Sequence, residues 1–159
     1  MRLTFTIQRF NPETDHHPHQ EEYRLDIGRG MTVLEALIRI KNELDGCLAL
    51  RYSCRSAICG SCSMHIYGTE KLASRTSIRK ELERHGNISI APLPNLPVIK
   101  DLVVDMSPFW EKILAVTPWL TPVTHPTKRY GSSGQLRLPP DSYQFHNVDA
   151  CIMCGACVE

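Results

Sequence analysis

Hydrophobic and polar residues alternate in two stretches near the start of the chain. The alternation over residues 3–10 and again over 23–27 predicts two strands, because successive side chains of a strand point to opposite faces of its sheet. The polar stretch 11–20 between them contains prolines and histidines, and this composition predicts a loop. Glycines at 28 and 30 close the second strand.

A helix is predicted directly after this pair of strands. Thr32 and Glu35 have the spacing of a capping box, in which Thr32 caps the first turn and Glu35 reaches back to it. The helix is expected to continue to about residue 44 and to be ended by Gly46. Its apolar face consists of Leu34, Leu37, Ile38 and Leu44.

Two further short strands are expected over residues 63–67 and 88–92, and a loop of small residues precedes the first of them. The order strand, strand, helix, loop, strand is that of a β-grasp sheet packed on one helix. We therefore predict an α+β fold, with a β-grasp domain over residues 1–100.

The pattern changes after residue 100. Ser107-Pro108 favours a helix start, because proline is tolerated in the first helical turn. The proline-rich and glycine-rich stretch 117–140 is typical of a linker, so residues 101–140 are predicted to be a connector with one short helix. Residues 141–159 contain a cluster of cysteines and are expected to begin a second domain.

Composition narrows the classes of function. The chain has 159 residues and a net charge of +1, which gives no electrostatic basis for binding nucleic acid. No run of about 18 apolar residues is present, so a membrane-spanning helix is not expected. The first residues resemble a strand and lack the apolar core of a signal peptide, which favours a reducing compartment.

The cysteines carry the candidate chemistry, and six of the seven lie in two groups. The first group, Cys54, Cys59 and Cys62, has the spacing C-x4-C-x2-C of plant-type [2Fe–2S] ligands. Small residues between the thiolates, such as Gly60 and Ser61, let backbone N–H groups approach sulfur. A zinc site and a set of structural thiols are the alternatives, but zinc sites usually have two separated ligand pairs.

The second group is Cys151, Cys154 and Cys157, with the spacing C-x2-C-x2-C that begins the ligand run of bacterial ferredoxins. The fourth cysteine of that run is absent from the sequence, so we expect the chain to be a fragment of a longer protein. A partial zinc knuckle and a coincidence of spacing are the alternative interpretations.

Residues 53–62, Ser-Cys-Arg-Ser-Ala-Ile-Cys-Gly-Ser-Cys, resemble the [2Fe–2S] signature of the iron–sulfur subunits of succinate dehydrogenase and fumarate reductase. Residues 92–105 and 151–157 are similar, in the same order, to later segments of that family. The resemblance implies that the β-grasp domain of residues 1–100 is of the 2Fe-2S ferredoxin type. It also implies an α-helical domain of the bacterial ferredoxin type, of which 141–159 would be the start. It also implies a [4Fe–4S] cluster on the second group, with its last ligand beyond residue 159, and a [3Fe–4S] cluster further on.

The chain departs from this family at the fourth [2Fe–2S] ligand. The family has a cysteine after a Leu-Ala pair, whereas this chain has Ser74 after Leu72-Ala73. Three hypotheses follow. Ser74 binds iron as an alkoxide, Cys47 takes its place, or the cluster is weakened or absent.

The function implied by the resemblance is electron transfer between the FAD of a flavoprotein subunit and quinone, in the interconversion of succinate and fumarate during respiration. Membrane-anchor subunits would be the other partners, and the enzyme would be the whole complex, since no catalytic side chain stands out here. The absence of a transit peptide favours a prokaryotic cytoplasmic location on the inner face of the membrane. The alternatives are a free-standing [2Fe–2S] ferredoxin and a cluster-free docking module.

Overall fold

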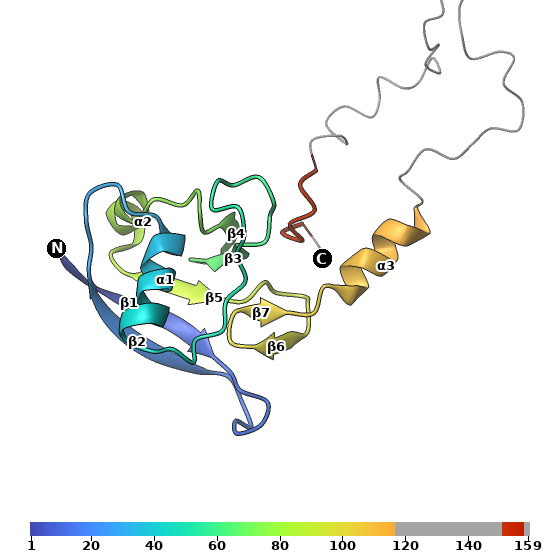
Figure 1. Cartoon of the computed structure of the whole chain (residues 1–159), viewed down its shortest axis with the longest axis horizontal. Coiled ribbons are helices and arrows are strands. Elements are labelled where there is room, and N and C mark those ends of the chain that lie inside the picture. The colour runs from blue at the N-terminus through green and yellow to red at the C-terminus, as the bar shows by residue number, and fades with distance from the viewer. Residues whose placement is uncertain (117–150, 158–159) are drawn as a thin grey trace, which may run out of the picture.

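A mixed sheet organises the N-terminal part of the protein, as seen in a computed structural model that describes residues 1–116 and 151–157 (Figure 1). Its strands follow the spatial order β2-β1-β5-β3-β4. β1 pairs antiparallel with β2 and parallel with β5, and β3 pairs antiparallel with both β5 and β4. The strands are β1 (Arg2–Arg9), β2 (His19–Asp26), β3 (Ser63–Ile66), β4 (Thr69–Leu72) and β5 (Ile88–Ala91).

Helix α1 (Val33–Glu43) crosses one face of this sheet and closes the main core (Figure 1). The expected capping box is confirmed: the Glu35 amide donates to Thr32 Oγ1 at 3.3 Å, and the Thr32 amide donates to Glu35 Oε2 at 2.7 Å. The helix ends at Glu43, with Leu44 rather than Gly46 as its C-cap. The fully buried side chains between helix and sheet include Phe5, Ile7, Leu37, Ile40, Ile66, Ile88 and Ile90.

Two elements of the sheet region were not predicted from the sequence. β4 forms because Tyr67 and Gly68 both have positive φ, 52° and 71°, which suits a tight two-residue hairpin turn. Helix α2 (Ile78–His85) is strongly charged and ends at Gly86, whose φ is 78°. The β-grasp fold of the ferredoxin type that the sequence predicted is otherwise confirmed.

A hairpin and a helix follow the sheet and form a second hydrophobic cluster. The hairpin consists of β6 (Val98–Lys100) and β7 (Val103–Val104), and α3 (Ser107–Ala115) starts at the predicted Ser107. The buried members of the cluster are Leu93, Leu96, Val104, Met106 and Phe109. The connector and the second domain, where they fall on residues 117–150 and 158–159, lie outside the described residues. Within the described ranges, no helix is long and apolar enough to cross a membrane.

A buried charge network holds the hairpin against the sheet. Arg9 lies on the inward face of β1, and its Nε donates to Asp101 Oδ1 at 2.9 Å. Asp101 is 1% exposed and also accepts hydrogen bonds from the amides of Phe10, at 3.1 Å, and Ala49, at 2.8 Å. Three chain segments far apart in sequence are therefore joined at one carboxylate.

Arg9 is also paired at its other end. Its Nη1 forms ion pairs with Asp45 and, at 2.9 Å, with Glu21, and it contacts the hydroxyl of Tyr23. Burial opposes the charge of Arg9, but the hydrogen bonds to Asp101 and Asp45 outweigh it and raise the pKa of the guanidinium. Tyr23 donates to Asp45 Oδ2 at 2.8 Å, and burial raises the pKa of its hydroxyl. The network therefore holds Arg9 charged at any pH at which the protein is folded.

We predict that Asp101→Asn destabilises the fold strongly. The substitution removes the charge that faces Arg9 and presents an NH₂ group to donors that now meet a carboxylate oxygen. Breaking a buried ion pair typically costs about 3–5 kcal/mol, and this loss would appear in urea denaturation followed by circular dichroism. The exposed Asp26→Asn is the control and should change stability by less than about 0.5 kcal/mol. Equal stability of the two variants would contradict the role given to Asp101.

Candidate functional site: two pairs of iron-ligand donors

The loop between α1 and β3 is wrapped around the thiol of Cys54. The amides of Ser56, Ile58 and Cys59 each donate to Cys54 Sγ at 3.4 Å. Arg55 and Ala57 have left-handed φ values of 58° and 57°, so the backbone turns successive N–H groups to the inside of the loop. Such a backbone nest favours anionic groups and recurs in phosphate and iron–sulfur sites.

Cys59 lies beside Cys54, and its surroundings lower the pKa of its thiol. Ser61 Oγ lies 3.0 Å from Cys59 Sγ, and the amide of Cys54 donates to the same sulfur at 3.5 Å. The hydrogen bond from Ser61, followed by that from the Cys54 amide, lowers the pKa of Cys59 to about 6. Because the thiolate is the form that binds metal, this environment suits a ligand.

Cys62 is paired with Ser74 at the other side of the loop. β3 and β4 align Ser63 with Leu72, so the residues just outside this pair, Cys62 and Ala73, also lie opposite each other. The Ala73 amide donates to the Cys62 carbonyl at 3.0 Å, and Ser74 Oγ lies 3.1 Å from Cys62 Sγ. Cys62 is 2% exposed, so its thiol is shielded from water, whereas Ser74 is half-buried.

Cys47, the other candidate for the fourth ligand, lies elsewhere. It is exposed after the end of α1, where its amide donates to Asp45 Oδ1 at 2.9 Å. The hydroxyl of Ser74, and not the thiol of Cys47, is therefore the group that the fold brings next to Cys62.

The candidate donors form pairs and do not converge on one point. Among the described residues, no three His, Cys, Asp or Glu side chains are grouped closely enough to hold a metal ion. Cys54 is adjacent to Cys59, and Cys62 is adjacent to Ser74. Two pairs of donors, with N–H groups directed at sulfur, fit the requirements of a two-iron cluster.

The second cysteine group is described over residues 151–157, where Cys151 and Cys157 are exposed and Cys154 is half-buried. The Met153 amide donates to Cys151 Sγ at 3.4 Å, as the amides of the first loop do to Cys54. The backbone of this segment packs directly against the first loop at Gly60. This contact was not predicted, because no pattern in the sequence relates residues so far apart.

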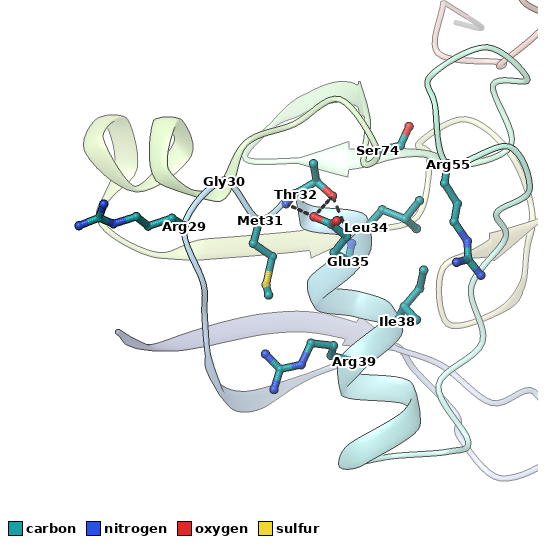
Figure 2. A pocket seen from close by; sticks show the side chains of 10 residues that line it. All are labelled: Arg29, Gly30, Met31, Thr32, Leu34, Glu35, Ile38, Arg39, Arg55 and Ser74. Atoms are coloured by element: carbon teal, nitrogen blue, oxygen red, sulfur yellow. Dashed lines mark hydrogen bonds between the residues drawn. The ribbon is translucent and has the colours of Figure 1, made fainter.

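A groove of about 480 Å³ lies beside Ser74 (Figure 2). Arg29, Arg39 and Arg55 line it together with the apolar residues Leu34 and Ile38. The guanidinium of Arg39 is already paired with Glu43, to which its Nε and Nη2 donate at 2.8 and 2.9 Å. Arg55 belongs to the loop between α1 and β3 that carries Cys54 and Cys59. It lies on the same side of α1 as Ser74 (Figure 2). Glu35, which also lines the groove, is held in the capping box. The surface next to the second donor pair therefore combines basic side chains, one of them paired with Glu43, with apolar contact area.

The sheet, the nest and the two donor pairs define an iron–sulfur protein of the ferredoxin type. Residues 4–111 match the family model described as "2Fe-2S iron-sulfur cluster binding domain", and the chain belongs to this family. It is 36% identical over 163 residues to the fumarate reductase iron-sulfur subunit of Haemophilus influenzae, a match that covers 98% of this chain and 62% of that protein. It is 39% identical over 155 residues to the succinate dehydrogenase iron-sulfur subunit of Paracoccus denitrificans, covering 96% and 57%.

The fold is also found in a solved structure of the Mycobacterium smegmatis Sdh1 complex in the apo form. The TM-score is 0.77 with 24% sequence identity, over 98% of this chain and 62% of that chain. This likeness confirms the fold. The chain spans between 57% and 62% of the length of these relatives. The sequence identity to the two curated subunits confirms the resemblance that the sequence motifs indicated.

We predict that Cys59 is alkylated through a thiolate that forms at mildly acidic pH. In the reduced, metal-free chain, the rate of its reaction with iodoacetamide should rise through a midpoint at about pH 6 and then level off. Ser61→Ala should move the midpoint to higher pH, because the largest contribution to the lowered pKa is the hydrogen bond from Ser61. Ser56→Ala is the control, since the Ser56 hydroxyl donates to the Cys54 carbonyl. Mass spectrometry of the Cys59 peptide measures the rate, and a profile insensitive to Ser61 would contradict the assignment.

Proposed function

We propose that this chain is the electron-transfer portion of the iron–sulfur subunit of a succinate dehydrogenase or fumarate reductase. Cys54, Cys59, Cys62 and Ser74 would hold the [2Fe–2S] cluster, which takes up and releases one electron at a time when bound. The observation that carries the proposal is the arrangement of these donors as two pairs, with the N–H groups of a backbone nest directed at the sulfur of Cys54. The names of the relatives support the same role.

The residues of the chain would tune the electron carrier and perform no acid–base chemistry. The three amides on Cys54 Sγ stabilise negative charge on that sulfur, so they favour the reduced state of a bound group. Ser74 acts in the opposite direction, because a hard alkoxide ligand stabilises ferric over ferrous iron. Burial of Cys62 keeps water from that side of the site.

The second group would extend the electron path. Cys151, Cys154 and Cys157 would supply donors to a [4Fe–4S] cluster, with the remaining ligand and a [3Fe–4S] cluster contributed by sequence beyond residue 159. The contact between this segment and Gly60 supports direct electron transfer from the cluster on the first cysteine group to the cluster on the second group. A free-standing carrier with one cluster would have no use for that contact.

The partners would be an FAD-containing flavoprotein, membrane-anchor subunits and, through them, quinone. Arg29 and Arg55, which line the groove, support docking of a subunit with acidic side chains at this face, close to Ser74. Arg39 is already paired with Glu43. The location that accords with these partners is the inner face of a prokaryotic cell membrane, where the subunit would be peripheral.

The test is iron and sulfide analysis combined with low-temperature EPR of the dithionite-reduced chain, prepared anaerobically with cluster-assembly proteins. We expect at least two irons per chain and the paramagnetic signal of a one-electron-reduced [2Fe–2S] cluster. A chain that contains neither iron nor signal would overturn the proposal and favour a cluster-free docking module.

Substitutions of Ser74 test the fourth ligand. Ser74→Ala removes the oxygen next to Cys62 and should weaken retention of iron at least about tenfold, measured by chelator competition. Ser74→Cys should retain the cluster and raise its reduction potential, because thiolate is the softer ligand. Cys47→Ser is the control and should change neither value. If Cys47→Ser, and not Ser74→Ala, released iron, Cys47 would be the ligand.

A further inference from the structure

Gly60 is in closer contact with the second cysteine segment than any side chain would permit. Its φ is +73°, and a Cβ built on it would lie 2.7 Å from Cys154 Cβ and 2.8 Å from Cys154 Cα. The same Cβ would lie 2.9 Å from the carbonyl oxygen of Ile152. Two of these atoms belong to the backbone, so no rotation of a side chain would relieve the overlap.

The second segment is also held from its other side. At Gly155, whose φ is +80°, a Cβ would lie 2.9 Å from Met106 Cε and 3.6 Å from Leu93 Cδ1. Met106 and Leu93 belong to the second hydrophobic cluster, which also includes Phe109 of α3. Residues 151–157 thus lie between the first cysteine loop and this cluster, as Figure 1 shows for the C-terminal segment.

A small cavity of about 120 Å³ lies at this junction. Cys59 of the first cysteine group and Met153, which stands between Cys151 and Cys154, both line it. Residues that flank or belong to both cysteine groups therefore face the same small space. The two groups approach each other at Cys59 and Gly60, with Cys154 as the nearest residue of the second segment.

We infer that Gly60 is a positioning residue that sets the separation between the two cysteine groups and so permits electron transfer between the cofactors they hold. The inference rests on the proposed function. The step moves one electron, with no bond formed or broken and no proton transferred. A shorter path between redox groups gives faster transfer, so the protein contributes by placing them close together.

Backbone conformation alone does not require glycine at this position. Ala57 and Arg55 adopt φ values of 57° and 58° in the same loop, so the loop accepts side chains in left-handed conformations. Gly68 has nearly the same φ as Gly60, +71°, and nothing lies within 4 Å of its missing Cβ. The close approach of Cys154 is what distinguishes Gly60.

The experiment compares Gly60→Ala with Gly68→Ala in the full chain by hydrogen–deuterium exchange. Gly60→Ala should displace the second segment, and amides within 152–156 should exchange roughly tenfold faster, which corresponds to about 1.4 kcal/mol of local stability. Gly68→Ala imposes similar backbone strain without the contact and should leave these amides unchanged. Equal exchange in the two variants, or free exchange of 152–156 in the unmodified chain, would overturn the inference.

Met106→Ala provides a second route if Gly60→Ala impairs folding. It removes packing from Gly155 and keeps Gly60 and the donor residues themselves, although Met106 shares the small cavity with Cys59. Exchange within 152–156 should therefore rise while the iron content stays that of the unmodified chain. An unchanged exchange rate in this variant would also count against the inference.

Iron analysis and EPR on the same samples test the proposed function separately from the role of Gly60. Bound iron together with an effect of Gly60→Ala on 152–156 supports both the proposed function and the inference. Bound iron without that effect overturns the inference alone. Protection of 152–156 in a chain that never binds iron would overturn the proposed function, and the electron-transfer role of Gly60 with it.

Discussion

The carboxylate of Asp101 is the point on which the arrangement of this protein depends. It accepts a charged hydrogen bond from Arg9 and two amide hydrogen bonds, from the end of β1 and from the chain after α1. Each of these donors is buried or half-buried and loses contact with water on folding. Without Asp101 each would be left with no hydrogen-bond acceptor in its place. Because Asp101 lies in the turn of the β6–β7 hairpin, the same carboxylate fixes the second hydrophobic cluster relative to the sheet. The cysteine segment 151–157 is then supported from that cluster.

The donor pairs arise from ordinary features of sheet geometry. A tight hairpin between β3 and β4 aligns the two strands, and this alignment places Ser74 beside Cys62. Cys54 and Cys59 come together through a loop with alternating φ signs, which directs amide groups inward. One pair is therefore set by strand register and the other by local backbone conformation. A change that shifted the register of β3 against β4 would act on the Cys62–Ser74 pair and leave the nest intact.

The sequence predicted the elements with strong periodic or capping signals and missed those without them. α2 has only Ile78 and Glu81 buried, and β4 is largely polar, so neither shows an apolar period of its own. The ligand spacing of the first group was visible in the sequence, and so was the anomaly of Ser74. The partner of Arg9 lies 92 residues away, and the contact of Gly60 with Cys154 spans a similar distance. Such pairings follow from tertiary packing, which local pattern does not encode.

The parallel pairing of β1 with β5 has a consequence for the synthesis of the chain. β1 is complete at Arg9, but its partner strand begins only at Ile88. At about 5–20 residues per second, the ribosome needs roughly 4–16 s to make the intervening sequence. During that interval β1 has only β2 beside it, and a lone pair of strands is marginally stable in water. The nascent chain therefore exposes an open strand edge until β5 emerges, and this edge is the part of the protein that a chaperone would need to cover.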